Sequence, residues 1–185
     1  NTWVIFTADH GEMLGDHHMS QKNLFFEGSA HVPLLIMPPQ GRSLPQNISV
    51  EAPTDLVDIY PTILAMAGLS SPVSVSGKNL LEPVPMDRMF FGNSLNKNFC
   101  VMEEKVKLVY SAVGDHVLLF DLNTDPMEQH NLAEDPAWQE RKAKLWKLLL
   151  EHTAQYTPEA LDEKGQFLTY EAPRFPGDVP GRWFG

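Results

Sequence analysis

Hydrophobic residues form two short, nearly unbroken runs in the first part of the chain, at residues 2–8 (TWVIFTA) and 32–37 (VPLLIM). Runs of this length that are rich in β-branched and aromatic residues are typical of strands buried on both faces. A buried strand needs a neighbour along each edge, and the chain offers few candidates. We therefore expect an incomplete sheet that belongs to the C-terminal part of a longer protein.

A helical spacing of apolar residues follows, from Leu56 to Ala67, and Gly68 comes directly after it. Thr54 is a candidate N-cap, and carboxylates in the first turn favour a helix at this point. We expect this amphipathic helix to pack on the sheet.

A second pattern occupies the C-terminal half. Short strands are predicted near residues 89–91 and at residues 100–103, 106–111 and 116–122, the last two joined as a hairpin. Asp135 followed by Pro136 is typical of a helix start. The pattern predicts a small antiparallel sheet with one helix across it. An extended tail from residue 157 would then place Phe175, Trp183 and Phe184 in surface hollows.

Charge and cysteine content exclude several classes of protein. The formal net charge of −10 argues against a surface that follows nucleic-acid phosphates. Cys100 is the only cysteine, so the chain has neither an internal disulfide nor a thiolate metal cage, and we expect this side chain in a core. No apolar run reaches the roughly 18 to 20 residues of a membrane span.

Candidate chemistry is concentrated between the two hydrophobic runs. Residues 9–31 are polar and contain four of the seven histidines. Asp9 and His10 follow the first strand, where ligands collect in open α/β sheets, and Gly11 allows the backbone to bend away. Both side chains can turn towards one cation, although Asp9 could equally cap a turn while His10 packs on the loop.

The same region resembles the sulfatases of the alkaline phosphatase superfamily. That family has a strand, Asp with Asn or His, Gly, a variable loop, Lys, Glu-Gly, and a Val-Pro strand. The matching residues are Asp9, His10, Gly11, Lys22, Glu27, Gly28, His31, Val32 and Pro33. The segments TDLVDIYPTILAMAGL and LLFDLNTDPMEQHNLAED also look like the family, so the resemblance covers most of residues 2–150.

The resemblance implies an α/β fold. Residues 1–98 would be the C-terminal part of an alkaline-phosphatase-like catalytic sheet, residues 99–155 a small antiparallel sheet with one packed helix, and residues 156–185 an extended tail. The chain would be a C-terminal fragment of a sulfuric-ester hydrolase. Such enzymes commonly work in the periplasm or outside the cell, but the chain itself does not indicate a compartment.

Residue roles also follow from the resemblance. Asp9 and His10 would supply half of a divalent-cation site. The family usually holds calcium, which we favour, while an imidazole also suits manganese or zinc. Lys22 would bind the sulfate ester and stabilise charge on the leaving oxygen as a catalytic residue. His17 would bind substrate or deliver a proton to the leaving alcohol. We expect Glu27 and His31 to be structural.

One expected feature is missing from the sequence. Sulfatases of this type form their formylglycine nucleophile from the cysteine of a C-x-P-S-R motif, and the chain has no such motif. The nucleophile and the other metal ligands would lie in an N-terminal part of the same protein, which becomes a necessary partner. We expect this chain alone to hydrolyse neither small-molecule nor carbohydrate sulfate esters.

Two other functions remain open from the sequence. A phosphonate monoester or phosphodiester hydrolase of the same superfamily shares the Asp-His-Gly loop and the following lysine. A non-catalytic interaction module, with the small sheet, helix and aromatic tail as a docking surface, belongs to a different class.

Overall fold

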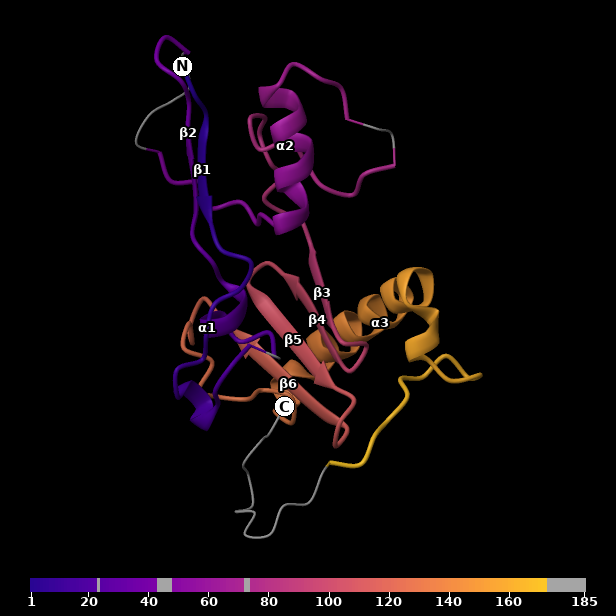
Figure 1. Cartoon of the computed structure of the whole chain (residues 1–185). Coiled ribbons are helices and arrows are strands. Elements are labelled where there is room, and N and C mark those ends of the chain that lie inside the picture. Colours follow the sequence, from indigo (N-terminus) through magenta and orange to yellow (C-terminus); the bar gives the residue numbers. More distant parts are fainter. Residues whose placement is uncertain (23, 43–47, 72–73, 173–185) are drawn as a thin grey trace. The chain divides into compact units, whose positions relative to one another are not determined.

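The chain forms two compact units in a computed structural model that describes residues 1–22, 24–42, 48–71 and 74–172. Unit 1 comprises Asn1–Asp9 and Val32–Arg88, and unit 2 comprises His10–His31 and Met89–Gly185 (Figure 1). The loop between the first two strands therefore groups with the C-terminal sheet, not with the strands that flank it. The domain boundaries at residues 98 and 155 stay a prediction.

Unit 1 contains a two-stranded antiparallel sheet. Strand β1 (Val4–Thr7) pairs with β2 (Leu34–Met37), with Phe6 opposite Leu35. The prediction that the first strand is buried on both faces is wrong for this chain, because Phe6 is 59% exposed, and Leu35 opposite it in β2 is 61% exposed. Alternate residues of each strand are partly covered and the others face outward, so one apolar face of this sheet has no second layer among the described residues.

The predicted helix of unit 1 is present with two differences. A 3₁₀ turn (Leu56–Asp58) leads into α2 (Ile59–Met66), and Gly68 ends it with a φ of 73°. Asp55, not Thr54, is the N-cap and forms a capping box with Asp58. The buried residues of α2 are Pro61 and Thr62. The expected apolar stripe is wrong in part, since Ile63 is 50% exposed.

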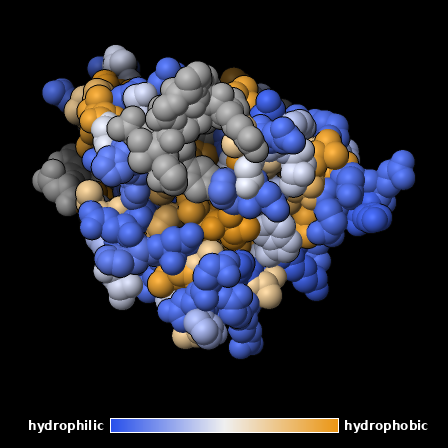
Figure 2. Space-filling view, turned by 90° about the horizontal axis from the view of Figure 1, so that it is seen from below, coloured by the Kyte–Doolittle hydropathy of each residue, from blue (hydrophilic) through white to orange (hydrophobic). Residues whose placement is uncertain are grey.

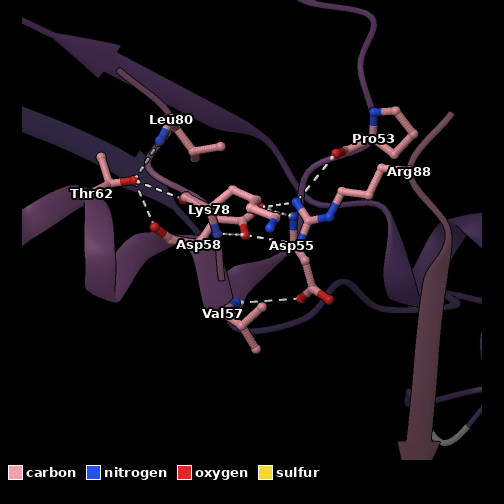
Figure 3. A network of polar contacts seen from close by, with 8 residues as sticks. All are labelled: Pro53, Asp55, Val57, Asp58, Thr62, Lys78, Leu80 and Arg88. Atoms are coloured by element: carbon pink, nitrogen blue, oxygen red, sulfur yellow. Dashed lines mark hydrogen bonds and ion pairs between the residues drawn. The ribbon is translucent and has the colours of Figure 1, made fainter. Parts of the chain in front are cut away.

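A polar network covers the side of α2 that carries the buried Thr62 (Figure 3). Asp58 is fully buried and accepts hydrogen bonds from Arg88 Nη2 at 2.9 Å and from the Lys78 backbone N–H at 2.7 Å. Thr62 accepts from the Leu80 N–H at 2.9 Å and donates to the Asp58 carbonyl at 2.6 Å. The network thereby fastens the segment from residue 78 to residue 88 onto the start of α2.

Unit 2 is built on a four-stranded antiparallel sheet. Its strands follow each other in space as they do in sequence: β3 (Phe90–Ser94), β4 (Asn98–Glu103), β5 (Val106–Ser111) and β6 (His116–Asp121). Helix α3 (Gln139–Tyr156) follows a 3₁₀ turn (Pro136–Trp138), and Asp135 caps this turn by accepting from the Ala137 N–H at 2.9 Å. The predicted small sheet with one packed helix is confirmed (Figure 1).

The main core of unit 2 lies between this sheet and α3. Leu108 of β5 and Leu145 of α3 are both 0% exposed, and Phe167 of the tail packs against Phe99 and Tyr110. The predicted contacts of Phe175, Trp183 and Phe184 fall outside the described residues. The unit is completed by the 3₁₀ turns Asp16–His18 and Pro158–Ala160 and by the single-turn helix α1 (Glu27–Ala30).

The surface of the protein carries both hydrophilic and hydrophobic side chains. Hydrophilic side chains dominate the face drawn in Figure 2, and hydrophobic side chains gather in smaller areas between them. No helix in the described part of the chain is long and apolar enough to cross a membrane.

Candidate functional site

The loop from His10 to His31 folds back on itself and is held by its own backbone. The Gly11 N–H donates to the Ser29 carbonyl at 2.8 Å, and the Met13 N–H donates to the Gln21 carbonyl at 3.0 Å. A Cβ on Gly11 would lie 2.2 Å from the Gly28 carbonyl oxygen, so only glycine allows this close approach. The closed loop brings residue 10 near residues that follow it by about twenty positions.

A small apolar cluster fixes this loop on the sheet. Met13, Met19, Leu24 and Phe26 are buried together with Phe120 of β6. Two flexible methionine side chains fill the irregular space under the loop. The loop therefore covers one face of the sheet, and α3 covers the other.

Two of the predicted site residues meet in this loop. The Lys22 ammonium is in hydrogen-bond contact with His10 Nε2, while His10 Nδ1 lies 2.7 Å from the Gly11 carbonyl oxygen. A carbonyl can only accept, so these partners assign the imidazole proton to Nδ1 and leave the Nε2 lone pair facing Lys22. A neutral histidine whose Nδ1–H is held by a backbone carbonyl is the usual arrangement for a metal-ligating Nε2.

The contacts described above involve only His10 of the two predicted metal ligands. Asp9 belongs to unit 1 and His10 belongs to unit 2, so the pairing of Asp9 with His10 on one cation stays a prediction. Among the described residues, no three His, Cys, Asp or Glu side chains gather as a metal site. An imidazole nitrogen and one carboxylate fit a divalent cation chemically, but calcium prefers six to eight oxygen ligands. These two residues alone would not complete a calcium site.

His17 lies apart from the contact between His10 and Lys22. Its ring stacks on Phe26 with centroids 4.1 Å apart, and its backbone has a positive φ of 52°. It lines a cavity of about 410 Å³ in unit 2. The other lining residues include Asp16, His18, Phe120, Glu128 and Asn131, and Lys22 is not among the described residues that line it. The substrate-binding role of His17 stays a prediction.

A buried charged group next to the loop was not predicted. The Lys107 side chain of β5 is 3% exposed, and its ammonium lies 2.8 Å from Glu128 Oε1 and also contacts Glu27. Burial alone would lower the pKa of Lys107, but the Glu128 and Glu27 carboxylates raise this pKa above its ordinary value. Burial would raise the pKa of Glu27, whereas Lys107 and His31 lower this pKa. Glu27 thus has the structural contacts expected of it.

The sequence contained one weak signal for this group. Lys107 interrupts an otherwise apolar strand, VKLVYS, and such a lysine usually faces solvent. The strand is buried on both faces because α3 covers one and the loop covers the other, a packing that the sequence pattern does not reveal.

Cys100 has the predicted place in the core. It is 1% exposed, and burial raises the pKa of its thiol to about 12. A thiol of this kind is not a nucleophile at neutral pH.

Comparisons with known proteins decide the family. The family model described as "N-sulphoglucosamine sulphohydrolase, C-terminal" matches residues 15–155, which is more than half of the chain. The chain belongs to the sulfatase family. The predicted resemblance to the sulfatases is thereby confirmed.

Individual relatives agree with this membership. The choline-sulfatase of Rhizobium meliloti is 34% identical over 192 residues, which covers 94% of this chain and 36% of that sulfatase. A 2-O GAG sulfatase structure has a TM-score of 0.72 at 24% identity and shows the same fold over 87% of this chain and 38% of its own. The phosphonate monoester hydrolase of Agrobacterium radiobacter is 33% identical, with a TM-score of 0.63, over 89% of this chain and 38% of that one.

The chain matches only part of the length of each curated relative. The chain spans about a third of the length of the curated relatives that it matches. The family uses a divalent metal and a formylglycine nucleophile, and the sequence of this chain has no C-x-P-S-R motif.

Proposed function

We propose that this chain is the C-terminal part of a sulfatase that hydrolyses sulfuric esters, in which Lys22 binds the sulfate group and His10 helps to hold a divalent cation. The contact between the Lys22 ammonium and His10 Nε2 carries this proposal, because it places a sulfate-binding cation beside a metal-ready imidazole. Membership of the sulfatase family supports the assignment of both roles.

The chemistry of each residue fits its role. An ammonium has three donors, so Lys22 can bind sulfate oxygens and stabilise the negative charge that grows on the bridging oxygen as the S–O bond breaks. His10 offers a nitrogen ligand through Nε2, and Asp9 offers carboxylate oxygens. A bound divalent cation supplies electrostatic stabilisation of the sulfate charge, and calcium is the cation that we favour.

Formation of the complete site requires a rearrangement at Lys22. In this chain the lysine occupies the lone pair that the cation would use. When His10 binds the metal, the Lys22 ammonium must move to another acceptor, and a sulfate oxygen is the natural replacement. Metal and substrate would thus favour each other's binding.

The remaining parts of the site lie outside this chain in the proposal. An N-terminal part would supply the formylglycine and the other metal ligands, and it would cover the exposed apolar face of β1 and β2. Sulfated carbohydrates are the substrate class that we favour, since the matching family model is that of a sulphoglucosamine sulphohydrolase. The chain alone would hydrolyse no sulfate ester.

Activity of the longer protein tests the proposal. The chain is produced with the sequence encoded upstream of it, and an aryl sulfate and a bis-aryl phosphate are assayed in parallel with added calcium. We expect sulfate hydrolysis that falls at least 100-fold in Lys22→Ala, but changes less than twofold in the control Lys147→Ala, whose side chain lies on the exposed side of α3. Full activity of Lys22→Ala would contradict the role of this lysine.

A second function is supported by one of the structural relatives. The phosphonate monoester hydrolase from Agrobacterium is as similar in sequence as the choline-sulfatase. Faster turnover of the phosphate diester than of the aryl sulfate, with the same dependence on Lys22, would assign the chain to that class instead.

A further inference from the structure

The Lys107 ammonium binds two residues of the loop that carries Lys22. It donates to the Phe25 carbonyl oxygen at 2.9 Å and to Glu27 Oε1, and it pairs with Glu128 Oε1 at 2.8 Å. These contacts are two hydrogen bonds and one ion pair, because Glu128 Oε1 lies within ion-pair distance of the ammonium without forming a hydrogen bond. Two of the partners belong to the loop.

Glu128 holds the same short segment from a second direction. Its side chain is 2% exposed, and its Oε2 accepts the Glu27 backbone N–H at 2.6 Å. Residue 128 lies beyond β6 and has a φ of 55°, which is uncommon for a residue other than glycine. A side chain outside the loop therefore binds the loop backbone at residue 27, and Lys107 binds it at residue 25.

Stability alone does not explain this arrangement. Buried ion pairs contribute little net stability, because removing the charges from water costs about as much as their attraction returns. An apolar side chain would fill the position of Lys107, which lies opposite Phe120 in the sheet register. It could not bind the Phe25 carbonyl or Glu27. What the charged group specifies is the position of the loop backbone.

Both site residues are close to this anchor along the backbone. Lys22 precedes Phe25 by three residues. His10 adjoins Gly11, whose N–H is bonded to the Ser29 carbonyl, two residues beyond Glu27. A shift of residues 25–27 would therefore move both partners of the contact between His10 and Lys22.

We propose that Lys107 and Glu128 are positioning residues that set the place of Lys22 and His10 for sulfate-ester binding. The catalytic consequence rests on the function proposed above, whereas the effect on the loop does not. Lys107 and Glu128 act through the backbone of residues 25–27 and do not touch the substrate.

Hydrogen exchange of this chain tests the structural half. In Lys107→Met we expect the amides of Gly11, Met13 and Glu27 to exchange at least tenfold faster, while the β4 and β5 amides stay within twofold of wild type. Arg141→Met is the matched control, since Arg141 is also a mostly buried cation but pairs with Glu103 of β4. It should leave the loop unchanged. Unchanged loop exchange in Lys107→Met would overturn the proposal.

A second variant covers the case in which Lys107→Met also opens the sheet. Glu128→Gln keeps the shape of the side chain but leaves one acceptor oxygen, so either Lys107 or the Glu27 N–H loses its partner. Faster exchange restricted to the loop supports the proposal. Equal acceleration in loop and sheet, in both variants, would show that these residues are merely structural.

Kinetics of the longer protein test the catalytic half. We expect Lys107→Met to lower kcat/KM for an aryl sulfate at least tenfold under conditions in which Arg141→Met changes it less than twofold. Equal losses in the two variants would overturn the positioning role. An inactive wild-type enzyme would instead contradict the proposed function and would leave the exchange result standing.

Discussion

The two units of this chain are stabilised in different ways. Unit 2 fully buries leucines from β5, β6 and α3 between its sheet and its helix. The described part of unit 1 buries Pro39, Ala52, Asp58, Pro61 and Thr62, but none of its leucines, isoleucines or phenylalanines. A hydrophobic core organises unit 2, whereas a polar network organises unit 1 and leaves its apolar side chains partly uncovered. This difference is expected if unit 1 meets the missing part of a sulfatase.

The core of unit 2 should show the largest response to a single substitution. Leu108→Ala removes a side chain that is 0% exposed and leaves a cavity between the sheet and α3. We expect the free energy of unfolding of unit 2 to fall by about 4 kcal/mol. Urea unfolding followed by NMR signals from each unit measures this change.

Ile63→Ala is the matched control in unit 1. Ile63 is 50% exposed, so its truncation should cost less than about 1 kcal/mol. Similar losses for Ile63→Ala and Leu108→Ala would remove the distinction between the two units.

The polar network should be the most sensitive feature of unit 1. Asp58→Asn removes the charge that binds Arg88 and leaves the guanidinium without its carboxylate. We expect the free energy of unfolding of unit 1 to fall by about 3 kcal/mol, since breaking a buried pair on one side strands the other partner. The same measurement on Asp87→Asn, an exposed neighbour, should show a change within about 0.5 kcal/mol. A loss in unit 2 as large as that in unit 1 would contradict the local role of Asp58.

The secondary structure was largely predictable from the sequence, and the packing was not. The strands of unit 2 and the 3₁₀ turn that begins after Asp135 and leads into α3 follow from alternation, turn residues and capping, which act between near neighbours. Exposure of Phe6 depends on a second layer that the described residues do not supply. The burial of Lys107 depends on a loop about eighty residues earlier. Family resemblance predicted separate roles for His10 and Lys22, but neither their direct contact nor the assignment of the imidazole proton.

Acid should weaken unit 1 through Asp58. Burial alone would raise the pKa of Asp58, but hydrogen bonds from Arg88 and from the Lys78 and Asp55 N–H groups lower this pKa below its ordinary value. A lowered folded-state pKa gives stability that is complete above the unfolded pKa of about 3.9 and is lost as the pH falls towards the folded value. The free energy of unfolding of unit 1 should therefore decrease as the pH falls below about 5.

Comparison with a variant isolates this contribution. Burial raises the pKa of Asp55, which acts in the opposite direction; this burial is present in both proteins, whereas the Asp58 charge, which also raises the pKa of Asp55, is present only in wild type. The drop in unfolding free energy of unit 1 between pH 7 and pH 3 should be smaller in Asp58→Asn than in wild type. Equal drops would show that Asp58 does not cause the acid sensitivity.

The exposed sheet face of unit 1 should give the smallest effect in this chain. Phe6→Ser replaces a side chain that is 59% exposed and faces no second layer among the described residues, so the unfolding free energy of unit 1 should change by less than about 0.5 kcal/mol. In the longer protein the same substitution should cost about 3 kcal/mol, because a covered phenylalanine would then be lost from a core. Thr7→Ser, on the alternate face of β1, is the control for altered strand propensity. An equally small effect of Phe6→Ser in both proteins would mean that this face is not where the N-terminal part packs, and unit 1 would then be organised by its polar network alone.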